Sequence, residues 1–228
     1  MPRYFSMKTP LHEALRQVRD LQAAILEKQR FKGYSGRARA LAGCGALTAA
    51  LLLHSPFIPA TPLAHLVTWT LVFLLGVALN YGALIYWFLH DPDVGRDVRR
   101  LRPTLEVMPV LVAGGILTLA LVNHEEYNLL FGTWMVMFGL TNFTGRQVLP
   151  RGLAWVGLFY LACGAGLLLV WPNLSFTENS LVMGGVFFLG EFFGGLVLHY
   201  DEKPMPSLRA FFGLPGGAPT PKSEDLSI

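Results

Sequence analysis

Charged side chains are scarce in this chain, and they are unevenly distributed. Asp, Glu, Lys and Arg make up 14% of its 228 residues, whereas a soluble domain carries about 25%. Long stretches contain no charge at all, and 53% of the residues are hydrophobic. This composition excludes an ordinary soluble domain and indicates a protein embedded in a membrane.

Cysteine and the common catalytic motifs are also nearly absent. The two cysteines, Cys44 and Cys163, lie inside apolar runs and form no CxxC or CxxH pair, so zinc and thiol-redox chemistry have no support. The chain contains no phosphate-binding glycine loop, nucleophile elbow or kinase motif. We therefore expect no enzymatic activity and no cofactor.

Six apolar segments predict an all-α, polytopic integral membrane protein with a six-helix transmembrane bundle. Backbone amides in lipid must be satisfied within their own segment, so each span is expected to be a helix. The predicted transmembrane domain covers 38–200, with spans at about 38–57, 63–89, 107–122, 128–143, 153–171 and 180–199. The third and fourth segments are short enough to be re-entrant. The sequence leaves open whether these two cross fully.

The 18 Lys and Arg residues predict the orientation of the bundle. They lie in the N-terminal segment up to Arg39, in two alternate loops, 90–106 and 144–152, and in the C-terminal tail. The loops expected on the opposite side contain none: 58–62, 123–127 and 172–179. Because basic residues are retained on the cytoplasmic side, both termini are predicted to be cytoplasmic, in the plasma (bacterial inner) membrane.

The two ends of the chain differ in character. Residues 1–37 are predicted to be a basic cytoplasmic segment, in which residues 10–31 form an amphipathic helix with apolar residues at three- and four-residue steps. This helix is expected to bind the inner leaflet or a partner helix. Residues 201–228 are rich in proline and glycine and are predicted to be a flexible cytoplasmic tail.

Glu191 is the candidate functional residue. With Arg39 counted in the flanking segment, it is the only charged residue inside a predicted span. A charge at this depth costs about 2.5–3.5 kcal/mol, so Glu191 is expected to face the bundle interior. Two interpretations stay open: a proton- or cation-responsive carboxyl, or a protonated Glu that bridges helices by hydrogen bonds. Its candidate polar partners are Asn80, Thr118 and Thr133.

A weaker candidate site lies in the loop between the third and fourth spans. His124, Glu125 and Glu126 stand together there and could bind a cation or sense pH. Adjacent residues seldom converge on one metal, and the loop has no HExxH motif. A solvated turn is the preferred interpretation, and no metal site is expected.

These features leave two functional hypotheses. The first is a non-enzymatic membrane subunit or regulator that acts through protein or lipid contacts. The second is a small proton- or cation-linked transporter or channel using Glu191, although few polar residues in the spans could line an aqueous path. The lipid bilayer is the expected partner, and nucleic acid is not, because no basic patch with stacking aromatics is present. Small-residue steps such as Gly190-x-x-x-Gly194 fit packing within one chain or a homo-oligomer.

Overall fold

The part of the chain that the structure describes is helical and contains no strand. The computed structural model describes residues 13, 15–19, 33–92, 97–144, 149–202 and 212. Its helices are α2 (Gly36–His54), α3 (Pro62–His90), α4 (Arg102–Asn123), α5 (Leu130–Thr144), α6 (Gly152–Leu169) and α7 (Ser180–Glu202), with short 3-10 turns η1 (Val98–Leu101) and η2 (Tyr127–Leu129). The prediction of an all-α protein is confirmed for these residues.

The predicted N-terminal amphipathic helix is described only in part. Within 10–31, residues 13 and 15–19 are helical and exposed. The remainder of that segment, and the tail 201–228 apart from 201, 202 and 212, lie outside the described residues. The extent of the amphipathic helix therefore stays a prediction.

Four of the described helices are long and apolar enough to cross a membrane. They are α3, residues Thr104–Asn123 of α4, α6, and residues Ser180–Asp201 of α7. The other two helices fall below this limit. The helix α2 has two arginines among its first four residues, which lower its hydropathy, and α5 has only 15 residues. The structure thus supports a membrane-embedded protein with four candidate spans.

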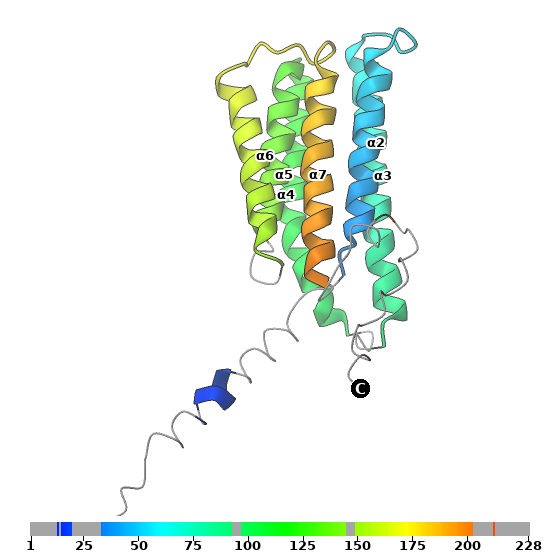
Figure 1. Cartoon of the computed structure of the whole chain (residues 1–228). Helices are drawn as coiled ribbons and strands as arrows, with labels where there is room; N and C mark the ends of the chain where they lie inside the picture. Colours follow the sequence, from blue (N-terminus) through cyan, green and yellow to red (C-terminus); the bar gives the residue numbers. More distant parts are fainter. Residues whose placement is uncertain are drawn as a thin grey trace, which may run out of the picture.

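Successive helices run in alternating directions (Figure 1). The start of α2 and the end of α7 consequently lie at the same end of the bundle, as do the end of α3, the start of α4, the end of α5 and the start of α6. We call this the basic end, because the α3–α4 and α5–α6 connections and both flanking segments carry the Lys and Arg residues.

Capping side chains determine where α2 and α3 begin. The Ser35 hydroxyl accepts a hydrogen bond from the Ala38 N–H at 3.3 Å. Thr61 caps α3 in the same way, with Pro62 at the first helical position. The cap at Ser35 starts α2 two residues before the predicted span, so Arg39 lies within the first turns of the helix.

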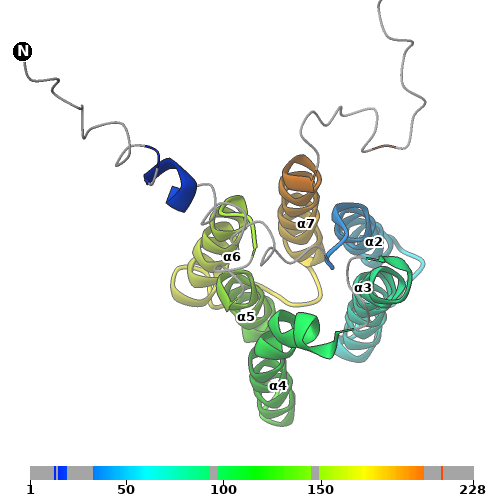
Figure 2. The same cartoon turned by 90° about the horizontal axis from the view of Figure 1, so that it is seen from below.

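The helices pack as an open arc whose ends are α3 and α4 (Figure 2). Moving along the arc, α3 contacts α2, α2 contacts α7, α7 contacts α6, α6 contacts α5, and α5 contacts α4. The first and last helices of the bundle, α2 and α7, share the most extensive interface. The arc therefore joins residues from opposite ends of the chain.

Glycines allow the closest helix contacts. A Cβ placed on Gly36 of α2 would collide with the carbonyl oxygen of Gly195 of α7. Between α5 and α6, a Cβ on Gly139 would stand 2.9 Å from the Gly157 carbonyl oxygen. Close backbone approach of this kind is a common means of helix association in lipid. The hydrophobic effect does not drive helices together there, so close van der Waals packing has to do so.

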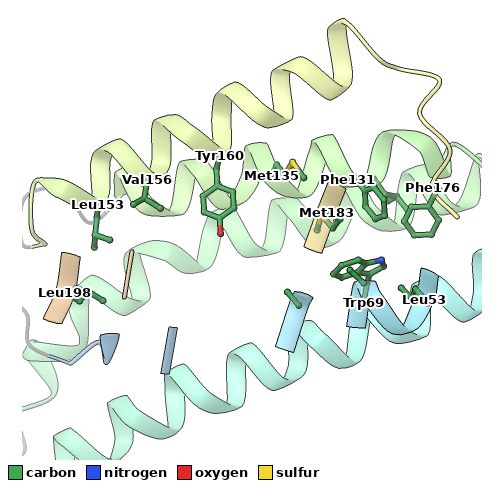
Figure 3. Close-up of a cluster of buried hydrophobic side chains, with 13 residues drawn as sticks. Leu53, Trp69, Phe131, Met135, Leu153, Val156, Tyr160, Phe176, Met183 and Leu198 are labelled. Atoms are coloured by element: carbon green, nitrogen blue, oxygen red, sulfur yellow. The ribbon is translucent and has the colours of Figure 1, made fainter. Parts of the chain in front are cut away.

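An apolar core runs along the inner side of the arc (Figure 3). Its aromatic part lies at the end opposite the basic end, where the Phe131 and Phe176 rings are 4.7 Å apart. The Phe176 N–H donates to the Asn128 side-chain oxygen at 3.0 Å, which fixes the α6–α7 loop on the core. The core thus closes this end of the bundle without charged groups among its members.

Candidate functional site: a buried Arg39–Glu191 pair

Glu191 lies at the middle of α7 and is buried, with 5% of its surface exposed. It faces the interior of the arc, as the cost of a charge in lipid requires. The neighbouring helices at this level are α2 and α6, which flank α7. Its carboxylate therefore needs partners from those helices.

The principal partner is Arg39 of α2. Its Nη2 donates to Oε1 of Glu191 at 2.7 Å, and its Nε donates to Oε2 at 3.0 Å. The two side chains are 11% and 6% exposed. This is a bidentate, charge-assisted contact, the strongest form of side-chain hydrogen bonding. Arg39 thus supplies a counter-charge, so protonation of Glu191, one of the two interpretations that the sequence leaves open, is not needed to account for its burial.

Two further helices contribute polar groups to the pair. The Tyr160 hydroxyl of α6 donates to Oε1 of Glu191 at 3.2 Å. The Asn142 side-chain oxygen of α5 accepts from Nη2 of Arg39 at 3.2 Å, while its amide nitrogen donates to the Phe138 carbonyl at 2.9 Å. The four side chains Arg39, Asn142, Tyr160 and Glu191, which we call the polar lock, connect α2, α5, α6 and α7.

Glycines provide the space that the polar lock occupies. A Cβ on Gly43 of α2 would stand 2.9 Å from the Cβ of Glu191, and one on Gly194 would stand 2.9 Å from the Cζ of Arg39. A Cβ on Gly190 would collide with the Tyr160 ring. The Gly190-x-x-x-Gly194 step therefore accommodates side chains of the lock, and helix backbones meet elsewhere.

The net charge of the polar lock is close to zero. The charges of Arg39 and Glu191 cancel each other, and the Tyr34 phenol, just before α2, interacts electrostatically with Arg39. Burial raises the pKa of Tyr34, and the positive charge of Arg39 opposes that rise. The Tyr34 phenol consequently stays neutral at physiological pH.

The partners proposed from sequence lie elsewhere. Asn80 donates to the Gly76 carbonyl of its own helix at 2.9 Å. Thr118 donates to the Gly114 carbonyl and accepts from Nε1 of Trp134 at 2.8 Å, which links α4 to α5. Thr133 lies on α5 away from the turn that carries Asn142. The structure brings none of these three to Glu191.

Sequence reasoning missed three members of the lock for different reasons. Arg39 was assigned to the flanking segment, although it falls inside the first predicted span. Asn142 and Tyr160 lie in predicted spans, but single polar residues of their type are common in membrane helices. Charge balance was the signal that could have found Arg39, because an acid inside an apolar bundle requires a basic side chain at a similar depth in the membrane.

The outer-loop candidates form the turn between α4 and η2. His124 ends α4, Glu125 has a φ of 60°, and the Glu126 N–H donates to the Leu121 carbonyl at 2.9 Å. A right-handed helix commonly ends with one residue in the left-handed conformation, as Glu125 does here. This helix ending explains the backbone conformation of the segment. In the described ranges, no group of three or more His, Cys, Asp or Glu is placed to hold a metal ion.

Comparison with known proteins adds no relative. No protein-family model, no curated protein and no solved structure matches this chain. The function is therefore inferred from the polar lock and from the surfaces around it.

Proposed function

We propose that the chain is a multi-pass protein of the plasma (bacterial inner) membrane in which all six helices, α2 to α7, cross the bilayer. Two observations support this proposal. The helix α2 packs between the candidate spans α3 and α7, and the short α5 packs between the candidate spans α4 and α6. The alternating directions of the helices also fit six crossings (Figure 1).

The proposed orientation places the basic end in the cytoplasm, with both termini. It is supported by the Lys and Arg distribution, which the positive-inside rule associates with the cytoplasmic face. A reporter that is active only in the cytoplasm is expected to be active when it is fused to either terminus. An exterior signal from one of them would contradict the orientation.

We infer that the protein is a non-enzymatic membrane subunit or regulator acting through protein or lipid contacts. The observation that carries this inference is the polar lock, in which Arg39 and Glu191 bind each other and are joined by one polar side chain from each of two further helices. Groups used in this way help to specify which helix faces meet. Candidate surfaces for partners are the predicted amphipathic segment 10–31, in which Leu15 and Val18 are exposed, and the exposed apolar side chains on the outer faces of the helices.

Removing residues 1–32 tests this function. The shortened chain retains Ser35, the cap of α2, and should therefore still insert in the membrane. We expect it to lose any protein that co-purifies with the full chain, because the apolar face of the N-terminal segment is gone. Unchanged complexes would contradict the proposal.

Point variants sharpen the deletion experiment. Leu15 and Val18 are about half exposed in the helical stretch, and replacing both with Ser should reproduce the loss of the partner. The matched control is Arg16→Ala, which removes only an exposed ion pair with Glu13 and is expected to weaken binding little.

One observation favours proton- or cation-linked transport as a second candidate. The Tyr160 hydroxyl, the Glu191 carboxylate and the Arg39 guanidinium form a connected polar chain within apolar helices. A carboxylate in such a chain can take part in proton transfer in membrane proteins. Glu191→Gln should then reduce proton flux into vesicles relative to the parent chain, whereas equal flux, or none in either, would eliminate transport.

A further inference from the structure

Two polar side chains of α3 are buried at the end of the bundle opposite the basic end. His65 is 0% exposed and Trp69 is 4% exposed. Among the residues that the structure describes, none forms a hydrogen bond with Nε2 of His65 or with Nε1 of Trp69. A buried polar atom without a partner is costly, and most such atoms bond to protein or to ordered water. These two nitrogen atoms therefore mark a place that a bound molecule would stabilise.

The hydrogen bond at the other imidazole nitrogen determines which nitrogen of His65 carries the proton. Its Nδ1 lies 3.0 Å from the Thr61 carbonyl oxygen of the same helix. Because a carbonyl oxygen can only accept, Nδ1 must carry the proton and donate it. In the neutral imidazole, Nε2 then has a lone pair and can only accept, whereas the indole nitrogen of Trp69 can only donate. The molecule that serves both atoms must therefore donate one hydrogen bond and accept another.

The two side chains are neighbours on one face of α3. They are four positions apart, and the Cβ atoms of such residues lie about 5–6 Å apart on a helix. Both rings also pack against the same aromatic pair. The His65 and Phe176 centroids are 5.8 Å apart, those of Trp69 and Phe131 are 5.7 Å apart, and Phe131 and Phe176 stand 4.7 Å apart. Figure 3 shows Trp69 beside this pair. The two nitrogen atoms therefore border the same small region of the core.

We propose that a water molecule binds between His65 and Trp69, accepting from Nε1 of Trp69 and donating to Nε2 of His65. Water meets both requirements at once and is the usual partner of buried polar groups that lack one in the protein. A metal ion is a poorer occupant, because in the described ranges no group of three or more His, Cys, Asp or Glu could hold it. This site lies at the opposite end of the bundle from the polar lock and does not depend on the proposed function.

Nuclear magnetic resonance on the full chain in lipid nanodiscs tests the site directly. With isotope-labelled tryptophan, the indole N–H of Trp69 is assigned by its loss in Trp69→Phe. In the parent chain it is expected to show a cross-peak to water protons. The indole N–H of Trp134, which donates to the Thr118 hydroxyl at 2.8 Å, supplies the reference chemical shift of a proton bonded to a hydroxyl oxygen. The Trp69 proton should resemble it.

A histidine variant tests whether the water joins the two side chains. His65→Phe removes the acceptor and keeps an aromatic ring, so the water cross-peak of Trp69 should disappear, while an unchanged Trp134 resonance shows that the chain is folded. The matched control is His54→Phe. His54 is exposed and ends α2 at the same end of the bundle, so its replacement should leave the cross-peak unchanged. Should His65→Phe fail to fold, labelled histidine in the parent chain reports whether Nε2 of His65 accepts a hydrogen bond.

Each contrary result overturns the proposal. A folded parent chain without a water cross-peak at Trp69 would show a dry site, in which the indole N–H faces an aromatic ring. A cross-peak that persists in His65→Phe, or an Nε2 that accepts no hydrogen bond in the parent chain, would show that water does not connect the two residues. Cross-peaks from Trp69 to the C–H protons of a bound organic molecule would show that the occupant is not water.

Discussion

Arg39→Ala is expected to lower the free energy of unfolding by about 3–5 kcal/mol, because it leaves the carboxylate of Glu191 buried without its counter-charge. The expectation follows from the bidentate contact and from the small exposed fractions of the two side chains. Reversible unfolding in lipid or detergent micelles measures the change. A loss below about 1 kcal/mol, the value of an exposed pair, would show that the contact is open to solvent.

The matched control removes both charges together. A chain carrying Arg39→Met and Glu191→Leu should recover most of the lost stability, since a well-packed apolar pair can replace a buried ion pair at little cost. Strongly non-additive effects of the two changes would establish the coupling by a double-mutant cycle. Additive effects would indicate that each side chain acts alone, and the polar lock would have to be abandoned.

Gly184→Ala is expected to destabilise the α2–α7 interface by about 1–3 kcal/mol, the usual cost of overpacking. Its new Cβ would collide with the Cβ of Ala50 and stand 3.0 Å from the Ala46 carbonyl oxygen. Backbone atoms cannot move aside as a flexible side chain can, so the two helices must separate. The same unfolding measurement detects the effect.

The neighbouring glycine provides the control. A Cβ on Gly185 meets nothing within 4 Å, so Gly185→Ala should be neutral or stabilise α7 by up to about 1 kcal/mol through helix propensity. The two variants differ only in the face of α7 that they alter. Equal effects at both positions would contradict the close approach of α2 and α7.

These two predictions concern the same interface from different directions. Small residues allow α2 and α7 to approach each other closely. This approach brings Arg39, in the first turn of α2, within hydrogen-bond distance of Glu191. The ion pair alone contributes specificity more than stability, because desolvation offsets much of its attraction. Packing and charge pairing together define which face of α7 meets α2.

Part of the fold could be predicted because it depends on local properties of the chain. Apolar segments of sufficient length must be helical in lipid, and the described helices fall close to the six predicted segments. The differences at the ends have local causes as well. Thus α4 begins at Arg102, before the apolar run at 107, since Pro103 is tolerated in the first turn of a helix.

The candidate site was predicted only in its first member. Glu191 could be identified because a charge in an apolar segment is costly wherever the helix packs. Its partners depend on which helices are neighbours, and residue spacing carries no information about that. Asn80 and Thr118 were reasonable candidates by depth. However, the Asn80 amide and the Thr118 hydroxyl each donate to a backbone carbonyl of their own helix.

The sequence by itself determined the chemical class of this protein: apolar helices with the Lys and Arg residues gathered at one end, and one acid where lipid should exclude it. Only the tertiary structure decided that α2 lies against α7, which joins Arg39 to Glu191 across 152 positions of chain. The physical reason is that the hydrophobic pattern of a membrane helix records its burial in lipid, whereas its choice of neighbour depends on the shapes of small-residue surfaces that meet only after folding.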